Sequence, residues 1–166
     1  MRTFLALLAG LALTAQAAIT SSYTNTDKDC VDAIDESSVP SGADIPQDCK
    51  GPGGYILYET YSLFSTVRGV MRSKDGPMVV QSILPENCPV AGYGKMVEWR
   101  LRNNVPFAVI QRVTCVALKE DGSGPGKKLG EWVVVQEIQG QKRKRLVDAL
   151  RTPNANIKAR EIADKF

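Results

Sequence analysis

The stretch CKGPGGYILYET at residues 49–60 places a lysine and three glycines ahead of an apolar run. Glycine-rich loops cradle phosphates where their backbone N–H groups converge at a helix N-terminus, usually with a lysine after the glycines. In this chain Lys50 precedes the glycines, Pro52 removes one donor, and the following residues are typical of a strand. We therefore interpret the motif as a tight turn that leads into a strand, in preference to an anion-binding loop.

The chain has no histidine, which excludes Ser-His-Asp and Cys-His nucleophile systems and most metalloenzyme sites. The remaining acid–base candidates are carboxylates, and Glu98, Glu137 and Asp148 lie on predicted strands. A facing pair of carboxylates could hydrolyse a glycosidic bond. Ion pairing with neighbouring basic residues is the simpler explanation for the presence of these three carboxylates. Nucleotide-binding and calcium-binding motifs are absent from the sequence, and we predict no cofactor and no metal.

Four cysteines, Cys30, Cys49, Cys88 and Cys115, occur in the chain. An even number in an exported protein favours two disulfides, for which three pairings exist. We favour Cys30–Cys49 and Cys88–Cys115, because each pair links neighbours in sequence. A zinc site is the rival interpretation, but it requires closer cysteine spacing and usually histidine.

The segment MVEWRLR alternates apolar and charged residues with a period of two, which is typical of a strand. Asn103-Asn104 tolerates positive φ, and VPFAVIQRVTCVAL follows, so we predict a hairpin with one apolar and one charged face. Trp99 belongs to the apolar face and is interpreted as a core anchor. The charged face comprises Glu98, Arg100 and Arg102, with Arg112 on the partner strand. It is either a recognition patch or a set of cross-strand ion pairs.

A second basic cluster, Lys142, Arg143, Lys144 and Arg145, precedes an apolar segment near the C-terminus. These residues could contact anionic lipid headgroups, lipopolysaccharide or an acidic partner. A solvated sheet edge that blocks strand pairing is the simpler interpretation. Residues 142–150 fit a strand or a helix, and the preceding Gly140-Gln141 turn favours the strand.

Other strands are predicted at residues 55–58, 63–71, 78–84 and 131–139 from their β-branched and aromatic content. Residues 18–47 show little periodicity, and residues 119–130 are predicted as a long loop. A C-terminal helix is predicted to begin with Thr152 as the cap and Pro153 at the first helical position. Its apolar face comprises Ala155, Ala159, Ile162, Ala163 and Phe166. The fold class is therefore α+β: a single domain with an antiparallel sheet of five to seven strands, a C-terminal α-helix packed on it, and two disulfides.

Residues 1–17 have a positive start, a short apolar centre and an Ala-Gln-Ala ending, which predict a secretory signal peptide. We therefore expect one exported domain at residues 18–166, located in the periplasm or secreted. No second apolar stretch is long enough to span a membrane. The net charge of +3 argues against nucleic acid as a partner.

Four stretches, SSYTNTDKDC, DCKGPGGY, VEWRLRNNVPFAVIQR and TPNANIKAREIAD, together span nearly all of the predicted mature chain. In these motifs the chain resembles a family of small, uncharacterised exported bacterial proteins. The resemblance implies an exported single domain and supplies no activity. Similar proteins often carry Asp-Leu-Arg where this chain has Thr66-Val67-Arg68, and Cys-His where it has Lys144-Arg145. The resemblance also implies that Cys88 and Cys115 are additions of this member, which supports their pairing.

We expect a non-catalytic binding module for a small anionic ligand or an envelope protein. The residues predicted to form its polar patch are Arg68, Glu98, Arg100 and Arg112. The alternatives are an inhibitor of an attacking hydrolase, a histidine-free hydrolase with two carboxylates, and a structural role in the envelope.

Overall fold

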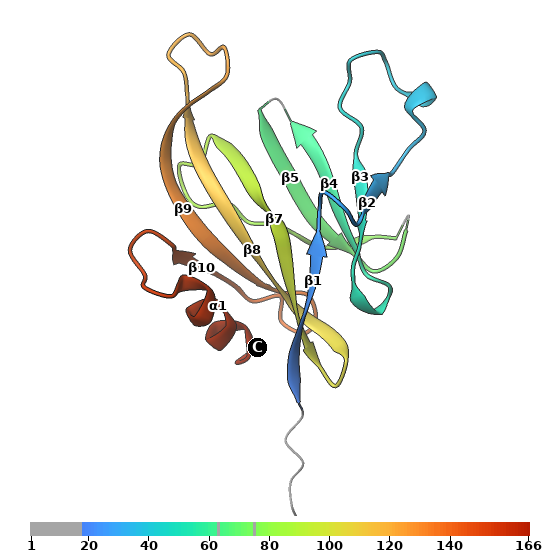
Figure 1. The fold of residues 1–166 in the computed structure, drawn as a ribbon, viewed down its shortest axis with the longest axis vertical. Helices are drawn as coiled ribbons and strands as arrows, with labels where there is room; N and C mark the ends of the chain where they lie inside the picture. The colour runs from blue at the N-terminus through green and yellow to red at the C-terminus, as the bar shows by residue number, and fades with distance from the viewer. Residues whose placement is uncertain (1–17, 63, 75) are drawn as a thin grey trace, which may run out of the picture.

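The fold is seen in a computed structural model that describes residues 18–62, 64–74 and 76–166 (Figure 1). The predicted signal peptide lies outside these residues. Within them the chain forms two antiparallel sheets of five strands each and one C-terminal α-helix, α1 (Ala155–Ala163). The predicted α+β class is confirmed, with a five-stranded sheet that carries the C-terminal helix. The separation of a second sheet was not predicted, although strands were predicted near β4 (Ile56–Ser62), β5 (Ser65–Met71) and β6 (Met78–Gln81).

The first sheet, here called the long sheet, has the strand order β1-β7-β8-β9-β10. Its strands are β1 (Ile19–Asn25), β7 (Val90–Arg102), β8 (Val105–Leu118), β9 (Pro125–Glu137) and β10 (Lys144–Asp148). The predicted hairpin is confirmed, since Asn103 and Asn104 have φ angles of 51° and 63° between β7 and β8. The strand interpretation of the segment after Gly140 is also confirmed, and β10 forms one edge of the long sheet.

The second sheet, here called the short sheet, has the order β2-β3-β4-β5-β6. Its strands are β2 (Cys30–Asp32), β3 (Gln47–Lys50), β4 (Ile56–Ser62), β5 (Ser65–Met71) and β6 (Met78–Gln81), with two short 3₁₀ helices, η1 (Glu36–Ser38) and η2 (Pro52–Gly54). Both predicted disulfides are confirmed. Cys30 and Cys49 lie directly opposite each other on β2 and β3, while the Cys88–Cys115 bond fastens the segment before β7 to β8.

The main core lies between the two sheets. Leu57 and Val70 from the short sheet pack with Val97, Trp99 and Val109 from the long sheet. The Trp99 side chain is fully buried, and its indole N–H donates a 2.9 Å hydrogen bond to the Thr24 hydroxyl on β1. Its predicted role as a core anchor is therefore confirmed.

The other face of the long sheet is covered by α1 (Figure 1). Three alanines on one stripe of the helix, Ala155, Ala159 and Ala163, are buried against this face, as their spacing predicted. The long sheet is thus the central layer, with the short sheet on one side and the helix on the other.

The start of the helix differs from the prediction. Helix α1 begins at Ala155, after Asn154 in a left-handed conformation with φ of 54°, and not at Pro153. The reason is a preceding turn in which the Asp148 carboxylate accepts the backbone N–H groups of Leu150 and Arg151. The N–H of Thr152 donates to the Asp148 carbonyl, so these residues are held outside the helix.

Two segments predicted as irregular contain strands. Residues 18–47 include β1, and residues 119–130 include the first part of β9. In β1 the sequence ITSSYTN lacks apolar alternation, so its strand conformation depends on pairing with β7. This is a tertiary contact, which local sequence patterns do not report.

The glycine-rich motif forms the tight turn that the sequence predicted. Gly53 and Gly54 adopt φ angles of 64° and 80° in η2, and the chain then enters β4. Gly51 has a different role, because a Cβ atom there would lie 2.6 Å from the Trp99 ring. The absence of a side chain at Gly51 therefore makes room for the central tryptophan.

We predict that Gly51→Ala destabilises the protein by about 1–3 kcal/mol, the usual cost of overpacking a core. Gly92→Ala is the matched control, because an added Cβ there meets no atom within 4 Å. The control should change the free energy of unfolding by less than about 0.5 kcal/mol. Urea denaturation of the oxidised proteins measures both values, and equal effects would contradict the close contact with Trp99.

Candidate functional site

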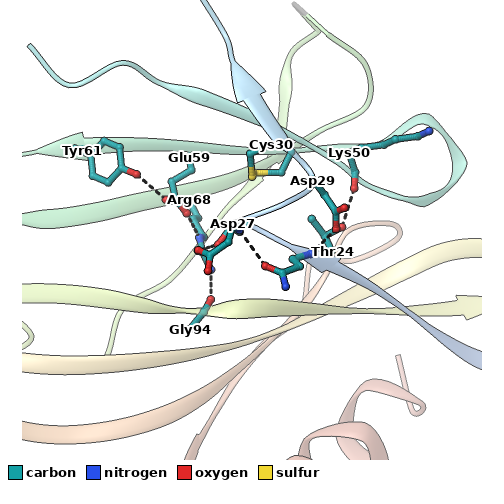
Figure 2. Close-up of a disulfide and its surroundings, with 12 residues drawn as sticks. Thr24, Asp27, Asp29, Cys30, Lys50, Glu59, Tyr61, Arg68 and Gly94 are labelled. Carbon is teal, nitrogen blue, oxygen red and sulfur yellow. Dashed lines mark hydrogen bonds and ion pairs between the residues drawn. A yellow bond between two sulfur atoms is a disulfide. The ribbon is translucent and has the colours of Figure 1, made fainter.

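Arg68 is buried in the layer between the sheets and lies apart from the other predicted site residues. Its guanidinium forms an ion pair with Glu59 on β4 and donates to the Gly94 carbonyl at 2.8 Å (Figure 2). It also donates to the Thr26 hydroxyl at 3.3 Å. It also lies 4.9 Å from the centroid of the Tyr93 ring. These contacts tie β5 to β4, to β7 and to the segment after β1, and the side chain is only 3% exposed. Its visible role is structural.

Glu98 and Arg100 lie together on β7, on the face that α1 covers. Each is only 8% exposed, so the charged face is not a solvated surface. A Glu98 carboxylate oxygen accepts hydrogen bonds from the Ser21 hydroxyl at 2.6 Å and from Arg160 at 2.7 Å. Arg100 binds both carboxylate oxygens of Asp164 at 2.8 Å, and its closest approach to Glu98 is 3.5 Å. The cluster fastens the helix to the sheet through buried, mutually paired charges.

Arg112 lies on β8 and completes this face. It forms an ion pair with Glu131 on β9 and donates a 3.0 Å hydrogen bond to the side-chain oxygen of Asn156 on α1. Glu131 also accepts from Lys128 at 2.6 Å. Arg112 is therefore held between sheet and helix, yet 39% of its side chain stays exposed.

Arg112, Arg160 and Glu98 line a pocket of about 300 Å³ between the long sheet and α1, which we call the arginine pocket. The rest of its lining is Tyr23, Gly94, Lys95, Met96, Ile110, Gln111, Val133 and Asn156. Of the four predicted residues, the structure thus brings Glu98 and Arg112 to one pocket. It places Arg100 beneath the same face and Arg68 elsewhere.

The helix contributes residues that the sequence analysis did not include, namely Asn156, Arg160 and Asp164. They recur every four residues, each directly after one of the buried alanines. Residues at this spacing share one helix face. The sequence therefore contained a signal for this contact: a polar stripe lies beside the apolar stripe of the helix, as expected for a helix that packs on a charged face of a sheet.

Electrostatics reinforce these contacts. The hydrogen bond to Glu98 raises the pKa of Arg160 above its ordinary value. Lys128 and, next, Arg112 lower the pKa of Glu131. At neutral pH the pocket therefore holds two charged guanidinium groups, each with part of its surface in solvent.

The other candidate carboxylates have separate partners. Glu137 is bound by Arg143, which lowers the pKa of the Glu137 carboxyl, and Asp148 organises the turn before α1. Neither lines the arginine pocket with Glu98. In the described part of the chain, histidine, cysteine and acidic side chains do not gather in the groups of three that could hold a metal ion.

In the basic cluster at residues 142–145, Arg143 is half-buried and the other three residues are exposed. Lys142 donates to the Ile138 carbonyl, and Arg143 binds Glu137 and lies 4.7 Å from the Phe166 ring centroid. Lys144 and Arg145 are exposed on the edge strand β10. Contact of the cluster with an anionic surface stays a prediction. A helix long and apolar enough to cross a membrane is not found among the described residues.

No family model, curated protein or solved structure matches the chain. The resemblance to small exported bacterial proteins stays a prediction, and we infer function from the geometry of the described residues.

We predict that Arg100→Met destabilises the protein strongly, because it removes the guanidinium that binds both carboxylate oxygens of Asp164 and lies 3.5 Å from Glu98. Breaking a buried ion pair costs about 3–5 kcal/mol, and the partial exposure of Asp164 places the loss near the lower end. Arg102→Met is the matched control, since Arg102 donates to the main-chain carbonyls of Asp164 and Phe166. It should cost about 1 kcal/mol. Equal losses in urea denaturation would contradict a structural ion cluster at Arg100.

We predict a pH-dependent contribution from Glu131. Its folded-state pKa lies below the ordinary value of 4.5, so its contribution to stability is present above that pH and is lost as the pH falls through the folded-state pKa. The difference in Tm between wild type and Glu131→Gln should therefore be largest above pH 4.5 and shrink in more acidic buffers. Thermal unfolding from pH 7 to pH 2 measures it. A difference that stays constant with pH would contradict the charge interaction.

Proposed function

We propose that this chain is a non-catalytic binding protein, located in the periplasm or secreted, whose arginine pocket takes a small anion. Two disulfides fit a protein outside the cytoplasm. The observation that carries the proposal is the pair of guanidinium groups at the pocket. Arg112 comes from the sheet and Arg160 from the helix, and about two fifths of each side chain is exposed (39% and 40%).

Both guanidinium groups keep hydrogen-bonding capacity. The bonds of Arg112 go to Glu131 and Asn156, and those of Arg160 go to Glu98 and Tyr23. A guanidinium has more N–H donors than two bound groups occupy, so each of these arginines keeps donors for a further acceptor. Its planar arrangement of donors matches a carboxylate or a phosphate. The pocket therefore presents oriented donors suited to an anion.

The charge balance of the pocket also favours an anion. Glu98 is its acidic residue, and this carboxylate already accepts from Ser21 and Arg160. Lys95 lies at the rim, where it pairs with the exposed Asp27. Two arginines and one lysine thus line the pocket with one carboxylate, while the acidic partners of Arg112 and Lys95, namely Glu131 and Asp27, lie outside the lining.

The pocket size limits the ligand. A volume of about 300 Å³ lies at the lower end of the range of roughly 300–1,000 Å³ for small-molecule sites. Met96, Ile110 and Val133 provide apolar contact beside the arginines. These dimensions suit a small metabolite with a carboxylate or phosphate group better than a polymer.

The test is a thermal-shift experiment on the oxidised protein at fixed ionic strength, with inorganic phosphate, citrate and glycerol 3-phosphate as probes. A probe at 100 times its dissociation constant adds about 2.7 kcal/mol of stability. In a domain of this size the Tm should rise by about 5–11 °C.

Two arginine variants make the test specific. Arg112→Gln should abolish the shift, because it removes the sheet-side guanidinium from the pocket. Arg151→Gln should preserve it, since this side chain is 89% exposed and lies outside the pocket. Absence of a shift with all three probes, or equal shifts in both variants, would overturn the proposal.

A further inference from the structure

We infer that the open edge of β1 and the adjoining groove form a second site, which binds an extended acidic segment of a partner protein by strand addition. This inference goes beyond the arginine pocket. It rests on the backbone of β1 and on three lysines that the small-anion proposal does not use.

The first observation is the direction of the β1 backbone groups. The Ala18 carbonyl accepts from the Asn103 N–H, and the Thr26 N–H donates to the Lys95 carbonyl. Hydrogen-bonded positions alternate along an antiparallel pair, and the register of β1 with β7 is unbroken. The even-numbered residues therefore bond to β7, while Ile19, Ser21 and Tyr23 direct their N–H and C=O groups away from it.

Among residues 18–62, 64–74 and 76–166, no strand pairs with this outer side, because β1 is the terminal strand of the long sheet. Further along, Asn25 already has partners for its outward groups: its N–H donates to Asp29, and its carbonyl accepts from Lys28 and Asp29. The stretch from Ile19 to Tyr23 is therefore the part of the edge available for another strand.

The second observation is that the two edges of the long sheet differ. The β10 edge carries Lys144 and Arg145, and charged residues are a common protection of edges against strand pairing. The β1 sequence ITSSYTN has no charged residue. The β1 edge therefore lacks the protection that the opposite edge has.

The third observation is a groove of about 670 Å³ beside this edge, which we call the lysine groove. Ser22 and Tyr23 of β1 line it on one side, and its lining also includes the Cys30 end of the disulfide that joins β2 to β3. Figure 2 shows that disulfide close to Lys50 and the segment after β1. The groove is therefore built on a covalently fixed part of the short sheet.

The chemistry of the lysine groove indicates the partner. Lys28, Lys50 and Lys74 line it together with Asp29 and Asp48, which leaves an excess of positive charge. All three lysines are exposed, and none forms an ion pair with a described residue. Val31, Pro52 and Ile56 provide apolar lining.

These features match the requirements of peptide binding by strand addition. Main-chain hydrogen bonds provide affinity, and pockets beside the edge select alternate side chains. The complementary occupant is an extended segment in which acidic residues alternate with apolar ones.

The probe is a fluorescein-labelled peptide of seven residues that alternates Glu and Val, blocked at both ends. Fluorescence anisotropy with the oxidised protein at fixed salt should show saturable binding. The corresponding Lys-Val peptide should not bind. An acidic peptide with N-methyl groups on alternate residues should lose binding, because N-methylation removes the donors that pair with β1. Equal binding of any two of these peptides, or no binding of the first, would overturn the inference.

Protein variants locate the site. Lys50→Gln/Lys74→Gln should weaken peptide binding about 3- to 30-fold. Tyr23→Pro removes an outward N–H at an edge position where proline is tolerated. It should bind about three- to tenfold more weakly than the matched Tyr23→Ala, which keeps that N–H. Equal affinities of the two Tyr23 variants would contradict strand addition, and the N-methylated peptide provides the same test without a protein variant.

Arg112→Gln separates this site from the arginine pocket and should leave peptide affinity unchanged. Loss of binding in this variant would overturn the second site. Concentration-dependent dimerisation that is blocked by Tyr23→Pro, without peptide binding, would also overturn it, because it would identify a second copy of the chain as the occupant.

Discussion

The constraint on which the structure depends is that the long sheet is covered on both faces. Strand β7 alternates apolar and charged residues, and a sheet with one solvated face would leave the charges in water. The short sheet covers the apolar face, and α1 covers the charged one. Glu98 and Arg100 must then find partners inside the protein, because unpaired buried charges are strongly destabilising. The helix supplies Arg160 and Asp164, and the arginine pocket exists where this pairing leaves guanidinium surface exposed.

The apolar side of the same sheet is organised around one large side chain. Trp99 is enclosed by both sheets, its indole N–H is satisfied by Thr24, and Gly51 leaves space for its ring. The Thr24 hydroxyl in turn donates to the Lys50 carbonyl at 2.8 Å. This chain of contacts fixes β1 against the segment that follows Cys49. The open edge of β1 and the lysine groove therefore share one rigid support, while the arginine pocket lies on the helix side of the long sheet.

Sequence patterns predicted those parts of the fold in which the local conformational preference agrees with the conformation that tertiary contacts impose. The β7–β8 hairpin was predictable because its alternation and its two asparagines point to the same conformation, and cysteine proximity in sequence indicated both disulfides. Strand β1 was not predictable, because ITSSYTN becomes a strand by pairing with β7. The site was predictable only in part. Glu98 and Arg112 do reach one pocket, but nothing local to Arg68 indicated that it faces the core. Arg160, which binds Glu98, lies 62 residues away from it in sequence.

The helix α1 and the charges that it pairs lie far apart in sequence. Arg160 and Glu98 are separated by 62 residues, and Arg100 and Asp164 by 64 residues. Contacts between distant parts of a chain require the closure of long loops, which is slower than the formation of local structure. We therefore expect the helix to dock on the charged face late in folding, after the local β7–β8 hairpin has formed.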